Sequence, residues 1–403
     1  MNCTSPENPK LIKTSNITSV IEKDNVSPRS NRRGYVSPLR SACPKSFDII
    51  EKRLDYSKLH KALASEKTLS FSLHDNLRCV IESIISKPGD PGTNIGNWIA
   101  ESKLIGEESA FGYAFSVTPK SQIPNRDKDS AIVVIKTLRN VKDVTTKDDL
   151  PHEAFVGLYC INELRRHVPN FMFTYGYTQC SGYSPIQKRK LCSQSGSVSH
   201  LILENIMNSS SIYRFIKKSF IDENITSTDI IKIFSQLFGA LKLAQEKFNF
   251  NHGDLHLGNI LIREFKEEIA VSVYLGNGRF ATILTQYVPY IIDFGMARVH
   301  KDGIEFKPTM THPGNDEDYL MENIILYFRN LLGRHGESEF SNKITQFGNR
   351  IIQQIDFPKP NGFIALTLDI LIKSREIYEY EGMNDINEKV YDSCLFTKEF
   401  TSK

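Results

Sequence analysis

Two short polar segments carry residue types suited to phosphoryl transfer. Residues 251–262 read Asn-His-Gly-Asp-Leu-His-Leu-Gly-Asn-Ile-Leu-Ile and contain Asp254 and Asn259, and residues 290–298 read Tyr-Ile-Ile-Asp-Phe-Gly-Met-Ala-Arg and contain Asp293. Such a reaction needs an aligned nucleophile, a metal ion bridging phosphate oxygens and a cationic cradle. Asp254 offers a carboxylate that can orient and deprotonate a hydroxyl. Asn259 and Asp293 offer the hard oxygen ligands that Mg²⁺ prefers.

The elements around these segments must bring them together. An apolar strand precedes Asp293, and apolar periodicity predicts a long helix over about residues 228–247, just before Asp254. A helix is also expected over 150–166, ended by Pro169. Alternation and apolar runs predict strands at 102–105, 113–118, 131–137, 171–177 and 200–203. A strand-rich segment therefore precedes one that we expect to be mainly helical.

In these residues the chain resembles the protein-kinase superfamily, whose catalytic loop runs H-R-D-L-x-x-x-N and whose metal-binding motif is D-F-G. The resemblance covers roughly residues 98–328. It implies an α+β, bilobal fold with a small strand-rich N-lobe and a larger helical C-lobe, and ATP and Mg²⁺ as cofactors. It also implies that Asp254 is the catalytic base, that Asn259 and Asp293 bind the metal, and that Lys136, in Val-Val-Ile-Lys, contacts the α- and β-phosphates.

The same resemblance assigns further roles around the nucleotide. Glu153 is expected to brace Lys136, with Glu163 on the same helix as the alternative. Leu203 would guard the adenine pocket, and the backbone of Glu204 to Ile206 would bond the adenine. An aspartate that anchors the catalytic loop is expected at position 318, Asp318.

The glycine-rich nucleotide loop is the poorest match. Residues 105–112 read Ile-Gly-Glu-Glu-Ser-Ala-Phe-Gly, so Ile105, Gly106 and Gly112 would flank the nucleotide. The segment lacks the middle glycine of G-x-G-x-x-G and is one residue longer. An ordinary hairpin is the alternative interpretation.

Other departures from the kinase pattern narrow the expected activity. Gly253 replaces the arginine that usually receives a phosphorylated activation loop, so switching by such phosphorylation is not expected. His256 stands where protein kinases usually carry a lysine near the γ-phosphate. An A-P-E triplet is absent, and residues 295–318 form a short segment, which puts the usual peptide-binding platform in doubt. Residues 263–288 are an insertion, expected to be a hairpin around Gly276-Asn-Gly278.

Three classes of function remain open on these residues. A serine/threonine protein kinase acting on a protein substrate is favoured, because Asp-Phe-Gly-Met-Ala-Arg is similar to the protein-kinase form. His-Gly-Asp followed by asparagine is also typical of small-molecule kinases of the aminoglycoside and choline kinase-like group. A pseudokinase that binds nucleotide without turnover is the third class. The composition and the segments around residues 153–171 also resemble predicted kinases of large cytoplasmic DNA viruses.

Composition sets the remaining bounds on the 403 residues. The 50 basic and 47 acidic residues are nearly balanced, so a nucleic-acid partner is not expected. No long apolar run predicts a membrane span or a signal peptide. The seven scattered cysteines are expected to be free thiols in a reducing, cytoplasmic compartment. For a viral protein this compartment would be the host cytoplasm or the virion. The expected domains are a disordered basic tail (1–45), a helical extension and linker (46–97), an N-lobe (98–206) and a C-lobe with C-terminal helices (207–403).

Overall fold

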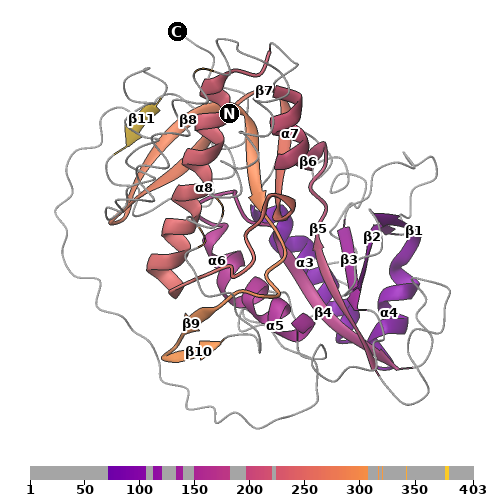
Figure 1. Ribbon diagram of the computed structural model, residues 1–403. Helices are drawn as coiled ribbons and strands as arrows, with labels where there is room; N and C mark the ends of the chain where they lie inside the picture. The colour runs from indigo at the N-terminus through magenta and orange to yellow at the C-terminus, as the bar shows by residue number, and fades with distance from the viewer. Residues whose placement is uncertain are drawn as a thin grey trace.

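The computed structural model describes residues 71–105, 112–119, 133–138, 149–181, 197–219, 224–306 and 377–380, together with residues 316, 320 and 342. The tail predicted for residues 1–45 and the helices predicted before residue 71 lie outside these ranges. In Figure 1 a five-stranded sheet lies towards the right, and a long helix with a long β-hairpin lies towards the upper left. Helices and strands are thus mixed along the described part of the chain.

The five strands that the sequence predicts in its first half all form. They make one antiparallel sheet with the order β1-β2-β3-β5-β4. Their bounds are β1 Ile99–Ile105, β2 Gly112–Pro119, β3 Val133–Leu138, β4 Thr174–Ser181 and β5 Ser197–Glu204. The central strand β3 turns Val133 and Ile135 into the core with no exposed surface. Lys136 follows on the opposite side of the strand, as alternation requires.

The helix predicted over 150–166 forms with a change of pitch in its middle. It consists of α5 (Asp149–Val156), the π-helical turn η3 (Gly157–Ile161) and α6 (Asn162–Leu164). Gly157 faces the side chain of Thr174 on β4 so closely that a Cβ there would collide with it. Asn162 then bonds both backbone groups of Thr174, donating to its carbonyl at 2.7 Å and accepting from its N–H at 2.9 Å. The helical segment is thereby fixed against β4.

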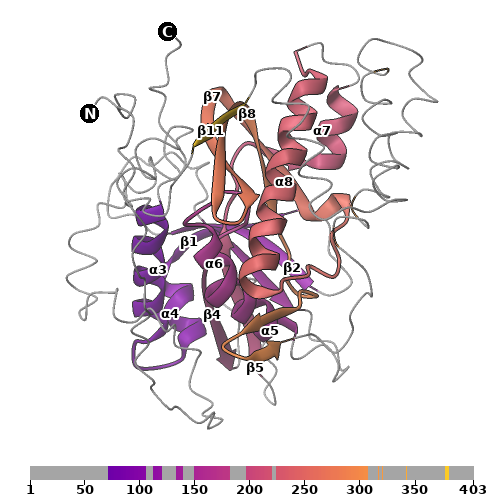
Figure 2. The same cartoon turned by 90° about the vertical axis from the view of Figure 1, so that its left-hand side faces the viewer.

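Two helices before the sheet complete this group of elements. The helices α3 (Phe71–Ile85) and α4 (Pro91–Trp98) contact each other and β4, and Figure 2 shows them together at its left-hand edge. The Gly-, Pro- and Asn-rich residues 88–97 predict a loop at the end of the linker, and this prediction is wrong from Pro91 onward. Proline is tolerated in the first turn of a helix, and burial of Ile95 and Trp98, one turn apart, outweighs the loop-like composition.

The second group of elements contains more strand than the sequence predicted. The helices are α7 (Ile212–Ser219) and α8 (Ser227–Phe248). A four-stranded sheet has the order β11-β8-β7-β6, with β6 Ser209–Ser211, β7 Ile260–Gly276, β8 Arg279–Ile291 and β11 Ile377–Tyr380. Short strands β9 (Val299–Lys301) and β10 (Ile304–Phe306) form a separate hairpin. The helix α8 packs along β7 and β8.

The predicted hairpin in the insertion is confirmed. Strands β7 and β8 are joined by Asn277 and Gly278, both with positive φ (54° and 75°), as a type I′ turn requires. Gly239 of α8 allows the hairpin to approach, because a Cβ there would lie 2.9 Å from the carbonyl oxygen of Tyr274. The insertion is therefore an extension of the two strands that connect the polar segments.

The helix α8 begins with a reciprocal cap that gives a first testable prediction. The Thr226 hydroxyl accepts from the Asp229 N–H at 3.2 Å, and the Asp229 carboxylate accepts from the Thr226 N–H at 2.8 Å. Thr226→Ala is expected to lower the free energy of unfolding by about 1 kcal/mol, because the Asp229 N–H loses the hydroxyl that accepts from it. Chemical denaturation measures the change. Thr226→Ser, which keeps the hydroxyl, is the control, and an equal loss in both variants would contradict the capping role.

One expectation about cysteines is wrong. Cys79 of α3 is disulfide-bonded. Cys160 is a free, buried thiol, and burial raises its pKa to about 12. The sequence could not show that Cys79 is paired, because a disulfide depends on how distant Cα and Cβ atoms meet in the folded chain. Among the described residues, no helix is long and apolar enough to cross a membrane.

Candidate active site

Lys136 lies at the centre of a three-residue ion cluster. Its Nζ donates to Oε2 of Glu153 at 2.8 Å and to Oδ1 of Asp293 at 2.7 Å. Burial alone would lower the pKa of Lys136, but the two carboxylates outweigh it and raise the pKa above its usual range. Burial raises the pKa of Glu153 to about 7 against the opposing charge of Lys136. The structure thus joins β3, α5 and the Asp-Phe-Gly segment at one point.

Of the two glutamates that could brace Lys136, only Glu153 does so. Glu163 instead pairs with Lys247 at 2.8 Å and with Lys301 at 3.7 Å, on the far side of the helical segment. The π turn Gly157–Ile161 lies between the two glutamates, so their side chains leave the helical segment in different directions. The direction in which each side chain leaves the helical segment therefore decides between Glu153 and Glu163 as the partner of Lys136.

The loop from His252 to Asn259 is held by its own backbone and by the strand beside it. The side-chain nitrogen Nδ2 of Asn259 donates to the backbone carbonyl of Asp254 at 2.9 Å. The backbone carbonyl of Asn259 accepts from the Ile292 N–H at 3.0 Å. The loop therefore lies directly beside Asp293, the next residue. The Asp254 side chain is 37% exposed, so its carboxylate is open to a substrate.

The aspartate that anchors this loop is Asp316 rather than Asp318. The backbone N–H groups of His252 and Gly253 donate to its two carboxylate oxygens, the second at 3.0 Å. Asp316 is 3% exposed, and burial raises its pKa against the opposing effect of His252. Two acids two positions apart cannot be distinguished by spacing to a distant apolar run. Asp318 itself lies outside the described residues.

Gly253 is required by the backbone of this loop. It has φ +73°, and a Cβ there would collide with the carbonyl oxygen of Met296. The missing arginine of the kinase pattern therefore has a steric reason here, since any side chain at this position meets the Asp-Phe-Gly segment.

Gly253→Ala is expected to lower the free energy of unfolding by about 3 kcal/mol, because backbone strain and a backbone collision add. Gly303→Ala is the matched control, since Gly303 has φ +80° and an added Cβ would meet nothing within 4 Å, and about 1 kcal/mol is expected for it. Urea denaturation of both variants measures the difference. Equal losses would show that the Met296 contact is unimportant.

His256 has a defined orientation next to Asp254. Its Nδ1 accepts from the Gly258 N–H at 2.9 Å, so the neutral ring carries its proton on Nε2, which lies 3.8 Å from Oδ2 of Asp254. A Cβ on Gly258 would lie 2.6 Å from Cε1 of the ring. His256 thus presents a hydrogen-bond donor beside the carboxylate, where protein kinases usually have a lysine.

Asp293 and Asn259 have the chemistry that a Mg²⁺ site needs. Asp293 follows β8 with φ +66°, and the next residue, Phe294, is buried against the rings of Phe171 and His252. The positive charge of Lys136 lowers the pKa of Asp293 although burial opposes it, so the carboxylate is ionised. The Asn259 nitrogen is used within the loop, which leaves its side-chain oxygen as a ligand. These two oxygen donors fit a hard divalent cation.

The predicted nucleotide-binding residues are only partly within the described chain. Ile105 ends β1 and Gly112 opens β2, while Gly106 lies outside the described residues. Leu203 and Ile206 are buried. The side chain of Glu204 is also buried, so only its backbone is left to contact a nucleotide. The structure brings the Lys136 cluster together, and the adenine contacts remain predictions.

Sequence reasoning missed three residues near this site. Asp318 was predicted in place of Asp316. The sequence also did not indicate His74 and Arg165, which contact the Glu204 carboxylate. No signal in one sequence marks them, because they come from segments far apart in the chain.

A lysine braced by a buried glutamate, beside an Asp/Asn loop and an Asp-Phe-Gly segment, is the arrangement of the protein-kinase superfamily. Comparison with known proteins agrees. The haspin-like kinase domain family matches residues 213–314. The probable kinase 098L of Invertebrate iridescent virus 3 is 27% identical over 208 residues, 51% of this chain and 33% of the viral protein. The serine/threonine-protein kinase haspin of Mus musculus is 36% identical over 73 residues, 18% of this chain and 9% of haspin.

Two further similarities complete the comparison. The uncharacterised protein 179R of Invertebrate iridescent virus 6 is 27% identical over 148 residues, 37% of this chain and 12% of that protein. The solved structure titled "WaaP in complex with acyl carrier protein" has a TM-score of 0.33 and 10% identity, over 70% of this chain and 92% of that one. The chain covers a third or less of these curated relatives. It contains a kinase-like domain related to the atypical members of the protein-kinase superfamily.

Proposed function

We infer that the chain is an ATP- and Mg²⁺-dependent phosphotransferase, acting as a serine/threonine protein kinase. The observation that carries this proposal is Lys136, which bonds Glu153 and Asp293 at the same time. Such a lysine is held rigidly where α- and β-phosphates would lie, next to a carboxylate suited to hold the metal. The similarity to haspin, which is named a serine/threonine-protein kinase, supports the choice of a protein substrate.

The proposed reaction divides among the residues as follows. The oxygen of the substrate hydroxyl bonds to the γ-phosphorus, and Asp254 takes the hydroxyl proton. At the same time the bond between the γ-phosphorus and the β–γ bridging oxygen breaks, and ADP leaves. Lys136 holds the α- and β-phosphates, and the Nε2 proton of His256 faces the γ-phosphate. Asn259 and Asp293 would hold Mg²⁺, which neutralises charge on the phosphates when bound. The backbone from Glu204 to Ile206 would bond the adenine.

The two groups of elements would serve as the two lobes around the nucleotide. Residues 98–206 would form the N-lobe and residues from 207 the C-lobe, with Ile105, Gly106 and Gly112 covering the phosphates. Activity without activation-loop phosphorylation is part of the proposal, because Gly253 offers no guanidinium.

Transfer from labelled ATP with Mg²⁺ tests the proposal. Wild type and Asp254→Asn are offered casein, a basic protein and a panel of small alcohols. Label on protein that disappears in the variant supports a protein kinase. Label confined to small molecules would instead identify a small-molecule kinase, and absence of label with retained nucleotide binding would identify a pseudokinase.

A further inference from the structure

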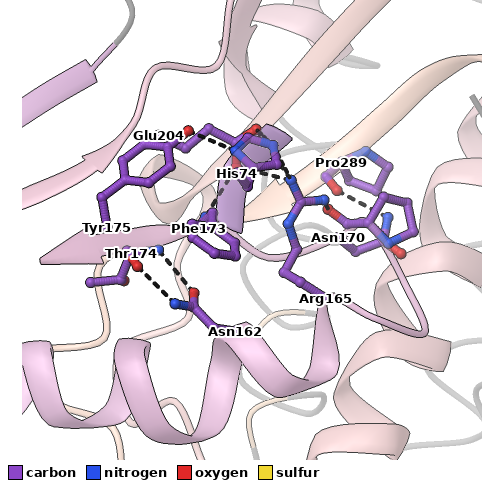
Figure 3. A network of polar contacts seen from close by, with 10 residues as sticks. His74, Asn162, Arg165, Asn170, Phe173, Thr174, Tyr175, Glu204 and Pro289 are labelled. Carbon is purple, nitrogen blue, oxygen red and sulfur yellow. Dashed lines mark hydrogen bonds and ion pairs between the residues drawn. The ribbon is translucent and has the colours of Figure 1, made fainter. Parts of the chain in front are cut away.

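The side chain of Glu204, at the end of β5, is turned into a buried polar cluster (Figure 3). Its Oε2 accepts from Nη2 of Arg165 and from the backbone N–H of Phe173, both at 3.0 Å, and its Oε1 lies 3.5 Å from Nε2 of His74. Burial alone would raise the pKa of Glu204, but Arg165 and His74 outweigh it and lower the pKa. A buried, ionised carboxylate therefore lies at the segment proposed to bind adenine.

Arg165 links this carboxylate to the helix that braces Lys136. Its Nη1 donates to the Pro169 carbonyl at 2.6 Å, and its guanidinium lies 5.5 Å from the ring centre of Tyr290. Arg165 caps the C-terminal end of the helical segment whose first part carries Glu153. One helical segment thus contacts both the phosphate-binding lysine and the adenine-binding segment.

His74 brings in α3, which precedes the part of the chain that resembles kinases. Its ring stacks on Phe173 with centroids 5.0 Å apart, and its Nδ1 lies 2.6 Å from the Tyr175 hydroxyl. Its Nε2 lies 3.4 Å from Nη2 of Arg165 and 3.5 Å from Oε1 of Glu204, so His74 contacts both members of the ion pair. His74 is 2% exposed, so both ring nitrogens serve this cluster rather than solvent.

Loss of one partner from such a cluster would disturb the adenine-binding backbone. A buried charge is stable only while its hydrogen bonds and ion pairs are complete. The Glu204 N–H also donates to the Phe173 carbonyl at 2.8 Å, so its backbone and carboxylate both depend on the position of Phe173, on which His74 stacks. A shift of His74 is thereby transmitted to residues 204–206.

We propose that His74, Arg165 and Glu204 form a positioning network through which helix α3 holds the adenine-binding segment in its productive geometry. The proposal rests on the proposed function, because it assumes that residues 204–206 bond the adenine. The helix α3 is then a built-in part of the nucleotide site, and its detachment from β4 would reduce nucleotide affinity without any change in Lys136, Asp254 or Asp293.

The test is the affinity of the full chain for ADP without metal, measured by isothermal titration calorimetry. His74→Phe keeps a flat ring to stack on Phe173 and removes both nitrogens. Its dissociation constant for ADP is expected to rise about tenfold. Tyr175→Phe, which removes only the hydroxyl that His74 contacts, is expected to weaken binding in the same direction and remains informative if His74→Phe fails to fold.

Tyr177→Phe is the matched control. It removes a hydroxyl from the same strand that bonds Ser199 at 2.7 Å instead of His74, so ADP affinity should be unchanged. Unchanged ADP affinity in both His74→Phe and Tyr175→Phe, or an equal loss in Tyr177→Phe, would overturn the network. A wild type that binds no nucleotide would refute the proposed function itself, which is a distinguishable result.

Discussion

Asp254→Asn is expected to lose about a thousandfold in phosphoryl transfer while it folds and binds nucleotide like the wild type. An amide cannot accept the proton of the substrate hydroxyl. The contact that orders the loop uses the Asp254 backbone carbonyl, which bonds the Asn259 amide, so the substitution leaves that contact in place. Single-turnover transfer from labelled ATP and titration of ADP measure the two properties separately.

Asp254→Glu is a useful companion to this variant. It keeps a carboxylate but moves it by one methylene, so activity should fall less than in Asp254→Asn. A variant with asparagine that keeps wild-type turnover would exclude Asp254 as the base. A variant that loses nucleotide binding to the same extent as turnover would assign Asp254 a structural role instead.

Asp293→Asn is expected to abolish the Mg²⁺ dependence of nucleotide binding and to lower turnover by about a thousandfold. The substitution removes the carboxylate that is proposed to bind the metal, together with its 2.7 Å ion pair with Lys136, while asparagine tolerates the φ of +66° at this position. The affinity for ATP is measured by titration, once with Mg²⁺ present and once with a chelator. Wild type should bind more tightly with Mg²⁺, and the variant should bind equally in both.

Asp302→Asn is the matched control for this prediction. Asp302 also has positive φ (53°), but it lies in the turn between β9 and β10. Its substitution should change neither the Mg²⁺ dependence nor the turnover. If Asp293→Asn retained the Mg²⁺ dependence, the metal site would have to be formed by other oxygen donors.

Local patterns predicted most of the elements that position the site. Alternation and apolar runs gave the five strands of the first sheet, and the Asn277-Gly278 turn gave the β7–β8 hairpin. The prediction failed where burial outweighed composition, as in α4, where Ile95 and Trp98 enter the core. It also missed the π turn at Gly157, which depends on contact with Thr174.

Residue type and order already indicate which side chains could do the chemistry. They point to Asp254, Asn259 and Asp293, and the resemblance to kinases adds Lys136; each lies next to an apolar strand or helix whose periodicity is local, and their roles stay predictions. Such signals depend only on neighbouring residues, and a single sequence therefore contains them.

The tertiary structure alone decided which groups support these side chains. In the folded chain Glu153 rather than Glu163 bonds Lys136, and Asp316 accepts from the backbone of the loop from His252 to Asn259. His74 and Arg165 contact the carboxylate of Glu204. Such contacts connect positions far apart in the chain, and the contact between Lys136 and Asp293 spans 157 residues. The geometry of these contacts depends on how helices and strands pack in three dimensions. Residue type and spacing in one sequence do not predict that packing.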